Sequence, residues 1–242
     1  MAILRIHGGL DAMPDDTKDK VIAPKISGLR APAAPDISAE RKPLLNAFIL
    51  NFKLSLTLSN KNRQFTFNVI RKAQDAFEEY CRAADSLKEY VAAGGLTLPP
   101  YFSAVRHFEH CVAHLYQAVR CLNALSRTWG GEKQFDHGDG SVLERIQIIH
   151  SAIKHMDERF ENGSLGDANS FALLATKSDG TKSIADDDAA GIENVPMWLT
   201  DDGLECAKAS VTYAELAGEI RQWYREAESM ATVTPGKKKA TL

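Results

Sequence analysis

The sequence contains few cysteines, and their spacing fits no cysteine-based scaffold. Four cysteines occur among the 242 residues, at positions 81, 111, 121 and 206, and no two of them form a CxxC pair. The spacing therefore indicates neither a zinc ribbon nor a disulfide framework. Reduced thiols in a cytosolic protein are the simplest interpretation, because disulfides form mainly in oxidising compartments.

An excess of positive charge is also lacking. The chain has 29 Lys and Arg residues against 32 Asp and Glu residues, a formal net charge of -3. Sequence-independent binding to nucleic acid needs concentrated Lys and Arg that displace counterions. The overall balance therefore argues against broad nucleic-acid binding, although it leaves room for a local basic patch.

No long apolar run is present. The N-terminal stretch MAILRIHGGLDAMPDD lacks the uninterrupted apolar core of a signal peptide. The most apolar window, residues 44–56 (LLNAFILNFKLSL), includes two asparagines and a lysine. It is also much shorter than the roughly 20 residues that cross a bilayer. We therefore predict a cytoplasmic protein that does not contact a membrane.

Common cofactor and catalytic motifs are missing as well. The sequence has no GxGxxG, no Walker loop, no GxSxG and no HExxH. We therefore predict no cofactor. Hydrophobic residues make up 44% of the chain and charged residues 25%, which is typical of a globular protein with a real core.

Three segments before residue 130 have helical character. Residues 41–58 are apolar on most faces, so we expect a buried helix there. Residues 62–95 form a long second segment that ends in a Gly-Gly pair, a helix-stop signal that tolerates left-handed backbone. Residues 101–129 follow two prolines, of which Pro100 suits the first turn of a third helix.

A fourth helix is predicted to begin at Ser141, because Glu144 follows three residues later in a capping-box pattern. At about 100° of rotation per residue, one apolar stripe of this helix should face the core. Its expected members are Val142, Ile146, Ile149, Ile153, Met156 and Phe160.

The pattern changes after this helix. Residues 169–175 and 195–207 are short apolar segments, and the second has Asp-Asp-Gly between two apolar runs, which is a hairpin signal. A last helix is predicted after a Ser or Thr cap. Its apolar residues with helical spacing are Tyr213, Leu216, Ile220 and Trp223.

These segments predict a mainly α fold, an antiparallel helical bundle with a small β-hairpin appendage and a C-terminal helix. Residues 1–40 hold four of the nine prolines and should form a flexible or extended arm, either docked or free. We expect the bundle over residues 41–162, and the β appendage with its closing helix over 163–232. Residues 233–242 should form a disordered basic tail.

Three histidines of the third helix share one stripe. His107, His110 and His114 lie at positions i, i+3 and i+7. Imidazoles with this spacing can converge on a transition metal. However, Glu109 lies off the stripe, and the sequence indicates no second helix with a comparable set of ligands. A polar stripe at the boundary of the bundle accounts for the histidines without metal, so metal binding is kept as an alternative.

The fourth helix carries the other candidate residues. His150 lies at the edge of the apolar stripe, His155 points to the opposite side, and Arg145 flanks the stripe away from His150. The two histidines therefore do not face each other within one chain. A joint site would need a second helix or a second subunit, and the alternative is that both histidines are simply exposed.

Two segments together resemble a known family. FSAVRHFEHCVAHLYQAV, followed by a loop and LERIQIIHSAIKHMDERF, resembles the HEPN helical bundle (higher eukaryotes and prokaryotes nucleotide-binding domain). The resemblance covers about residues 45–160. It implies an all-α, often dimeric protein of prokaryotic toxin, abortive-infection or RNA-processing systems. Active members of the family are metal-independent ribonucleases.

The family's signature is an arginine, often followed by a polar residue, and a histidine about four to six residues beyond. Two alignments fit this sequence. In one, His155 takes the histidine position, His150 the arginine position and Ser151 the polar position, which loses the guanidinium that stabilises an oxyanion at any pH. In the other, Arg145 and His150 match the spacing literally.

We therefore expect a cytosolic HEPN-like protein that serves as a non-catalytic interaction or RNA-binding module of a prokaryotic defence or toxin-type system. Lys154 and Arg159 are the cations expected to contact RNA, and the expected partners are a second copy of the chain, RNA or another protein. One alternative is a metal-independent endoribonuclease. In it a histidine is the general base on the ribose 2′-hydroxyl, and Arg145 or protonated His150 stabilises the phosphate. The other is the metal-binding bundle.

Overall fold

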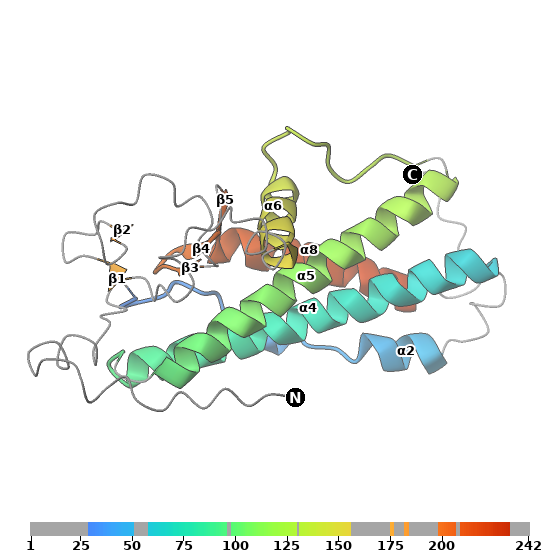
Figure 1. Ribbon diagram of the computed structural model, residues 1–242. Helices are drawn as coiled ribbons and strands as arrows, with labels where there is room; N and C mark the ends of the chain where they lie inside the picture. Colours follow the sequence, from blue (N-terminus) through green and yellow to red (C-terminus); the bar gives the residue numbers. More distant parts are fainter. Residues whose placement is uncertain are drawn as a thin grey trace, which may run out of the picture.

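The structure is a computed structural model. It describes residues 29–50, 58–95, 98–129, 131–155, 175–176, 182–183, 198–206 and 209–232. Within these ranges five α-helices pack together beside short antiparallel strands, and the last helix follows the strands (Figure 1). The predicted fold class, a mainly helical bundle with a small β appendage and a C-terminal helix, is therefore confirmed.

Two long helices form most of the bundle. The helices α4 (Asn60–Ala92) and α5 (Leu98–Trp129) run antiparallel and lie side by side (Figure 1). At 1.5 Å per residue, each helix is about 50 Å long. α4 begins after Ser59, whose hydroxyl accepts a hydrogen bond from the backbone N–H of Asn62. This N-cap satisfies one of the free donors in the first turn.

The turn between these two helices depends on the predicted Gly-Gly pair. Gly94 and Gly95 have φ angles of 68° and 72°, in the left-handed region that favours glycine. The N–H of Gly95 donates to the carbonyl of Tyr90, and the N–H of Gly94 donates to that of Val91. This pair of bonds is a Schellman motif, which satisfies the last carbonyls of α4 and turns the chain towards α5.

α5 contributes an apolar face to the core. Phe108, Val112 and Leu115 are fully buried, as is Val119, and Leu122 is 7% exposed. α4 contributes a matching buried face, in which small residues such as Ala76 and Ala83 lie near aromatic residues such as Phe77 and Tyr80. Because the small side chains allow close approach, the larger ones pack between the two helices.

The helix α6 (Val142–Lys154) starts at Ser141 as predicted, and the Ser141 hydroxyl accepts from the N–H of Glu144. The reciprocal half of the capping box is absent. The carboxylate of Glu144 instead accepts from the N–H groups of Gly138 and Gly140, and the N–H of Ser141 donates to Asp139. Glu144 therefore organises the preceding loop rather than its own N-cap.

The predicted core stripe of α6 is partly wrong. Ile146 and Ile149 are buried as expected, but Leu143 and Ala152 occupy the remaining buried positions. Val142 and Ile153 are only partly buried. The whole buried face is therefore rotated by part of a turn, because α6 packs against α5 and also against the strands. The expected stripe members Met156 and Phe160 lie outside the described residues.

The hairpin predicted from Asp-Asp-Gly is confirmed, and it belongs to a three-stranded antiparallel sheet. The strands β3 (Trp198–Leu199), β4 (Gly203–Cys206) and β5 (Ala209–Thr212) follow each other in spatial order. A second small sheet pairs β1 (Ala175–Thr176) with β2 (Lys182–Ser183). The strand β5 was not predicted.

Gly203 is needed for the close approach of β4 and β5. A Cβ atom at this position would overlap the carbonyl oxygen of Val211 and lie 2.6 Å from the Cα of Thr212. The turn before Gly203 is closed by Thr200, whose hydroxyl accepts from the N–H of Gly203 at 3.0 Å. The Asp-Asp-Gly sequence thus supplies the one residue type that this turn tolerates.

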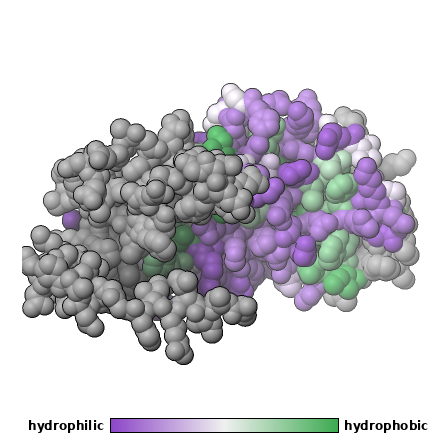
Figure 2. Space-filling model, in the orientation of Figure 1, coloured by the Kyte–Doolittle hydropathy of each residue, from purple (hydrophilic) through white to green (hydrophobic). Residues whose placement is uncertain are grey.

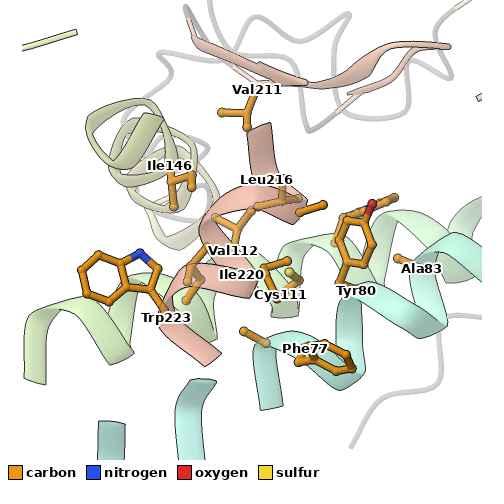
Figure 3. Close-up of a cluster of buried hydrophobic side chains, with 14 of the residues drawn as sticks. Phe77, Tyr80, Ala83, Cys111, Val112, Ile146, Val211, Leu216, Ile220 and Trp223 are labelled. Carbon is orange, nitrogen blue, oxygen red and sulfur yellow. The ribbon is translucent and has the colours of Figure 1, made fainter. Parts of the chain in front are cut away.

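The last helix, α8 (Tyr213–Ala231), is fixed by a complete capping box between Thr212 and Glu215. The four predicted apolar residues of this helix are all buried. Figure 3 shows Leu216, Ile220 and Trp223 of α8 in one cluster with residues of α4, α5, α6 and β5. α8 therefore joins the helical part of the core to the sheet.

The residues before α4 pack against the bundle. Among residues 29–40, Leu29 and Ile37 are buried, and the backbone N–H groups of Arg30 and Ala31 donate to the carboxylate of Asp201. A short 3-10 turn (Ser38–Glu40) leads to the helix α2 (Leu44–Leu50). Residues 1–28 lie outside the described part of the chain, and the limits predicted for the arm, the appendage and the tail stay predictions.

The first predicted helix begins later and is less buried than expected. The described helix covers Leu44–Leu50 instead of residues 41–58, and residues 51–57 are not described. Leu44 is buried, but Ile49 is 55% exposed. Apolar residues on most faces of α2 therefore did not mean burial of each one, since the helix packs mainly against α4 and α8 within the described part of the chain.

Within the described ranges, no helix combines the length and the apolar character that crossing a membrane requires. α4 and α5 are long enough, but both carry charged side chains along their length.

Candidate functional site

Arg145, the arginine of one candidate motif, forms a structural ion pair. Its Nη2 donates to Glu215 Oε1 at 2.7 Å, and its Nη1 lies 3.2 Å from Glu215 Oε2. Nη1 also donates to the backbone carbonyl of Ser210 at 2.8 Å. The guanidinium hydrogen bonds lower the pKa of Glu215 to about 2. Arg145 thus ties α6 to β5 and to the first turn of α8.

His150 lies on another side of α6. It is five residues from Arg145, a rotation of about 140° on a helix. Its ring packs on Tyr116 of α5, with a centroid distance of 4.6 Å. The structure therefore does not bring Arg145 and His150 together within one chain, as the two side chains contact different neighbours.

The surroundings of His150 favour its neutral form. Burial lowers the pKa of His150, and the positive charges of Lys154, Arg120 and His155 lower it further. A neutral imidazole can accept a proton, but it cannot supply the positive charge that a phosphate needs. In the alignment that places His150 at the arginine position, this histidine is therefore poorly suited to its role.

His155 ends the helix. It is the C-cap residue of α6, and its backbone N–H donates to the carbonyl of Ser151. Its charge acts on His150, which places both histidines near one end of α6. Lys154 beside it is exposed, and Arg159 lies outside the described residues.

Of the three histidines on α5, two contact a carboxylate of α4. Nδ1 of His107 lies 2.6 Å from Glu79 Oε2, and Nδ1 of His110 lies 3.8 Å from the same oxygen. Burial acts to raise the pKa of Glu79, but the hydrogen bond and charge of His107 hold it below its usual value, together with Arg82 and His110. The spacing of the histidines did not indicate this acidic partner, because Glu79 belongs to a different helix.

The third histidine contacts a cation. Nδ1 of His114 lies 3.0 Å from the ammonium nitrogen of Lys72, so a neutral His114 accepts a hydrogen bond from it. Burial lowers the pKa of His114, and Lys72 lowers it further. Across the described residues no group of three or more His, Cys, Asp or Glu side chains is arranged to hold a metal ion. The structure thus does not converge the three histidines on one point.

A basic groove between α4 and α5 was missed by the sequence analysis. We call it the α4–α5 groove, and its volume is about 490 Å³. No acidic side chain is among the described residues that line it. The lining residues that matter here are Phe65, Asn68, Arg71, Lys72, Arg120 and Arg127.

A second groove lies on the other side of α5. This α5–α6 groove has a volume of about 190 Å³ and includes residues of the loop before α6. Its lining includes Tyr116, Arg120, Arg127, Lys133, Phe135, Asp136 and Gln147. Asp136, the acidic residue of this lining, lies 3.4 Å from the ammonium of Lys133. Arg120 and Arg127 line both grooves, so they form a basic ridge between them.

The charge of this end of the bundle differs from that of the whole chain. Residues 60–74 of α4 include Lys61, Arg63, Arg71 and Lys72, and residues 110–131 include Arg120 and Arg127. Neither stretch contains Asp or Glu. Where α4, α5 and α6 face the viewer in Figure 2, the described surface is mostly hydrophilic. The absence of acidic residues from both stretches could have indicated this basic region. The net charge of the whole chain did not reveal it, because acidic residues elsewhere offset these cations.

The fold and these grooves define a mainly helical bundle with a basic, aromatic-containing face at one end. Comparisons with protein-family models, with curated proteins and with solved structures found no match for this chain.

Proposed function

We propose that this protein is a non-catalytic RNA-binding module with a HEPN-like helical bundle. The observation that carries the proposal is the basic ridge formed by Arg120 and Arg127, which line grooves on both sides of α5. Phosphate groups attract Arg and Lys, and the release of counterions then drives binding. Aromatic side chains beside such a groove provide surfaces on which bases stack.

The ridge is available for a ligand because acidic side chains do not neutralise it. In the described part of the chain, neither Arg120 nor Arg127 forms an ion pair with a carboxylate. Arg120 lies 5.9 Å from the ring centroid of Tyr116, and Nε of Arg127 donates weakly to the carbonyl of Asn123. Both side chains are exposed, so their charges act on the solvent side.

The non-catalytic part of the proposal rests on Arg145. Its guanidinium is held by Glu215 and by the carbonyl of Ser210, so freeing it to stabilise a phosphate would break the contact between α6 and α8. The two side chains are 29% and 35% exposed, so the cost of opening the pair comes mainly from losing its three hydrogen bonds together. We therefore place Arg145 in the architecture of the bundle.

One observation, the environment of His150, supports the alternative that the protein is a ribonuclease. A neutral His150 beside Tyr116 could act as a general base, and the charges of Arg120 and Lys154 act on it. Such an enzyme would use Arg120 rather than Arg145 to stabilise the phosphate. The expected cytoplasmic location, homodimer, protein partner and role in a defence or toxin-type system belong to the same proposal.

The test measures RNA binding and RNA cleavage in one set of proteins. Wild type, Arg120→Gln/Arg127→Gln and Arg145→Ala are incubated with labelled RNA in EDTA. We expect binding by the wild type and by Arg145→Ala, weak binding by the double variant, and no cleavage. Cleavage that disappears with His150→Gln would establish the ribonuclease instead. Absence of RNA binding by the wild type would refute the proposal.

A further inference from the structure

We infer that the ligand is single-stranded RNA, and that its phosphates enter the α4–α5 groove while the strand crosses the basic ridge into the α5–α6 groove. This inference rests on the proposed function and assigns it a form of RNA and a path. The path follows from four features: the groove width, two unsatisfied polar atoms, the arrangement of cations, and the aromatic residues.

The width of the α4–α5 groove favours a single strand. Its walls are two adjacent packed helices, whose axes lie about 8–10 Å apart in such packing. A volume of about 490 Å³ is in the range of small-molecule sites, so it accepts one or two nucleotide units. Duplex RNA is instead contacted across wide minor grooves and over many base pairs.

Arg71 points to an anionic ligand in this groove. Its Nε atom is buried and has no hydrogen-bond partner within the described residues, and its Nη2 makes only a long contact of 3.4 Å to Asn68. A buried N–H without an acceptor costs free energy. A phosphate oxygen in the groove would supply that acceptor in a charge-assisted hydrogen bond.

Lys72 adds a second cation beside Arg71. Burial lowers the pKa of Lys72, and the neighbouring Arg71 lowers it further, while Asp75 acts in the opposite direction. His114 accepts a hydrogen bond from the ammonium at 3.0 Å and so fixes its position. Two cations held this close repel each other, and a bound phosphate would relieve the repulsion.

In the α5–α6 groove, the buried polar atom of interest is a hydrogen-bond acceptor rather than a donor. Oε1 of Gln147 is buried and, within the described residues, has no donor. A ribose 2′-hydroxyl or a base amine would supply one, and phosphate cannot. Tyr116 and Phe135 line the same groove and offer aromatic rings to a base. The α4–α5 groove therefore suits the phosphates of a nucleotide chain, and the α5–α6 groove suits its riboses or bases. Arg120 and Arg127 lie between the two grooves.

The experiment uses fluorescence anisotropy to compare three labelled nucleic acids of 12 nucleotides per strand. They are single-stranded RNA, the corresponding RNA duplex and single-stranded DNA. The variant Arg71→Gln/Lys72→Gln removes the two cations on the α4 side. Arg106→Gln is the matched control, because Arg106 is an exposed arginine of α5 that lines neither groove. Circular dichroism confirms that each variant is folded.

We expect the wild type to bind single-stranded RNA at least tenfold more tightly than the duplex. The α4-side double variant should lose roughly tenfold or more in affinity, and the salt slope should fall by about 1.4, since each phosphate contact on a single strand contributes about 0.7. Arg106→Gln should bind as the wild type does. A smaller preference for RNA over DNA in Gln147→Ala would assign the donor to the 2′-hydroxyl, and an unchanged preference to the base.

Two outcomes would overturn this path and leave the proposed function standing, and a third would overturn both. Duplex RNA bound as tightly as the single strand would refute the single-strand assignment. An Arg71→Gln/Lys72→Gln variant that binds like Arg106→Gln would refute the α4–α5 groove. Wild-type protein that binds no RNA but binds vesicles containing phosphatidylserine would assign the groove to a membrane surface, and the proposed function would fail with it.

Discussion

Two arginine-containing regions of this bundle lie on different helices, and they use the guanidinium differently. At the junction of α6 and α8, Arg145 is matched by one carboxylate and one carbonyl. On the ridge of α5, Arg120 and Arg127 are exposed, and the α4–α5 groove they border has no acidic lining residue in the described part of the chain. A satisfied arginine holds the fold together, and an unsatisfied one is left for a ligand.

The first region shows how much one carboxylate can connect. Glu215 accepts from Arg145, from the backbone N–H of Thr212 and from the hydroxyl of the same threonine. It thus serves the capping box of α8 and the ion pair with α6 at once. Among the described residues, the basic ridge has no comparable acidic connection, so replacing Arg120 and Arg127 should leave the stability of the fold unchanged.

The largest expected effect concerns the ridge. Arg120→Gln/Arg127→Gln should weaken RNA binding by roughly 100-fold at low salt, because it removes charges from both grooves. The midpoint of thermal unfolding should stay within about 2 °C of the wild type, since surface substitutions usually change stability little. Anisotropy titrations at several salt concentrations measure the first effect and calorimetry the second. A stable variant that binds RNA normally would contradict the claim that the ridge binds RNA.

The next effect concerns the junction. Arg145→Ala should lower the free energy of unfolding by about 1–3 kcal/mol, because it leaves the carboxylate of Glu215 without its main partner and removes a hydrogen bond to the Ser210 carbonyl. RNA affinity should change less than about twofold. Urea unfolding and anisotropy on the same preparation test both statements. A large loss of RNA affinity in the folded variant would show that Arg145 takes part in RNA binding.

Many local features of the fold could be predicted, because their causes are local. The Gly94-Gly95 turn, the Ser141 cap and the Asp-Asp-Gly hairpin each depend on a few adjacent residues. The exact buried face of α6 could not, because Val142 and Leu143 are both apolar and only the neighbouring elements select between them. The resemblance to the HEPN family stays a prediction.

The candidate site was harder to predict for a physical reason. The α4–α5 groove needs Arg71 and Arg120, which are far apart in the sequence and meet only after the two helices pair. Likewise, the partner of Arg145 lies 70 residues further along the chain. Sequence spacing indicated candidates within one helix, but the ion pairs and grooves that decide their roles form between helices.

A smaller effect should appear in acid. The folded pKa of Glu215 is about 2, against an ordinary value of 4.5. This group therefore stabilises the fold above pH 4.5, and that contribution is lost as the pH falls from 4.5 towards 2. Because the side chain is 35% exposed, screening should reduce the contribution to about 1–2 kcal/mol. Unfolding at a series of pH values should show this loss in the wild type and a flatter profile in Glu215→Gln.

The smallest effect concerns His150. Its pKa in the folded protein is lower than its ordinary value of 6.5, so the unfolded chain binds a proton more readily. Stability should therefore decrease as the pH falls below 6.5, by less than about 1 kcal/mol for this half-buried group. His150→Phe should remove that part of the pH dependence and keep the contact with Tyr116. An identical pH profile in the two proteins would contradict the lowered pKa.

The most direct test of the account maps RNA contacts on the folded protein by NMR. Single-stranded RNA is added to protein labelled with ¹⁵N, and shifts of the backbone and arginine Nε–H signals are followed. We predict changes at Arg71, Arg120 and Arg127, and an unchanged signal for Arg145. Changes confined to Arg145 and His150, with the ridge unaffected, would show that the family-like motif is the binding site and would contradict the account.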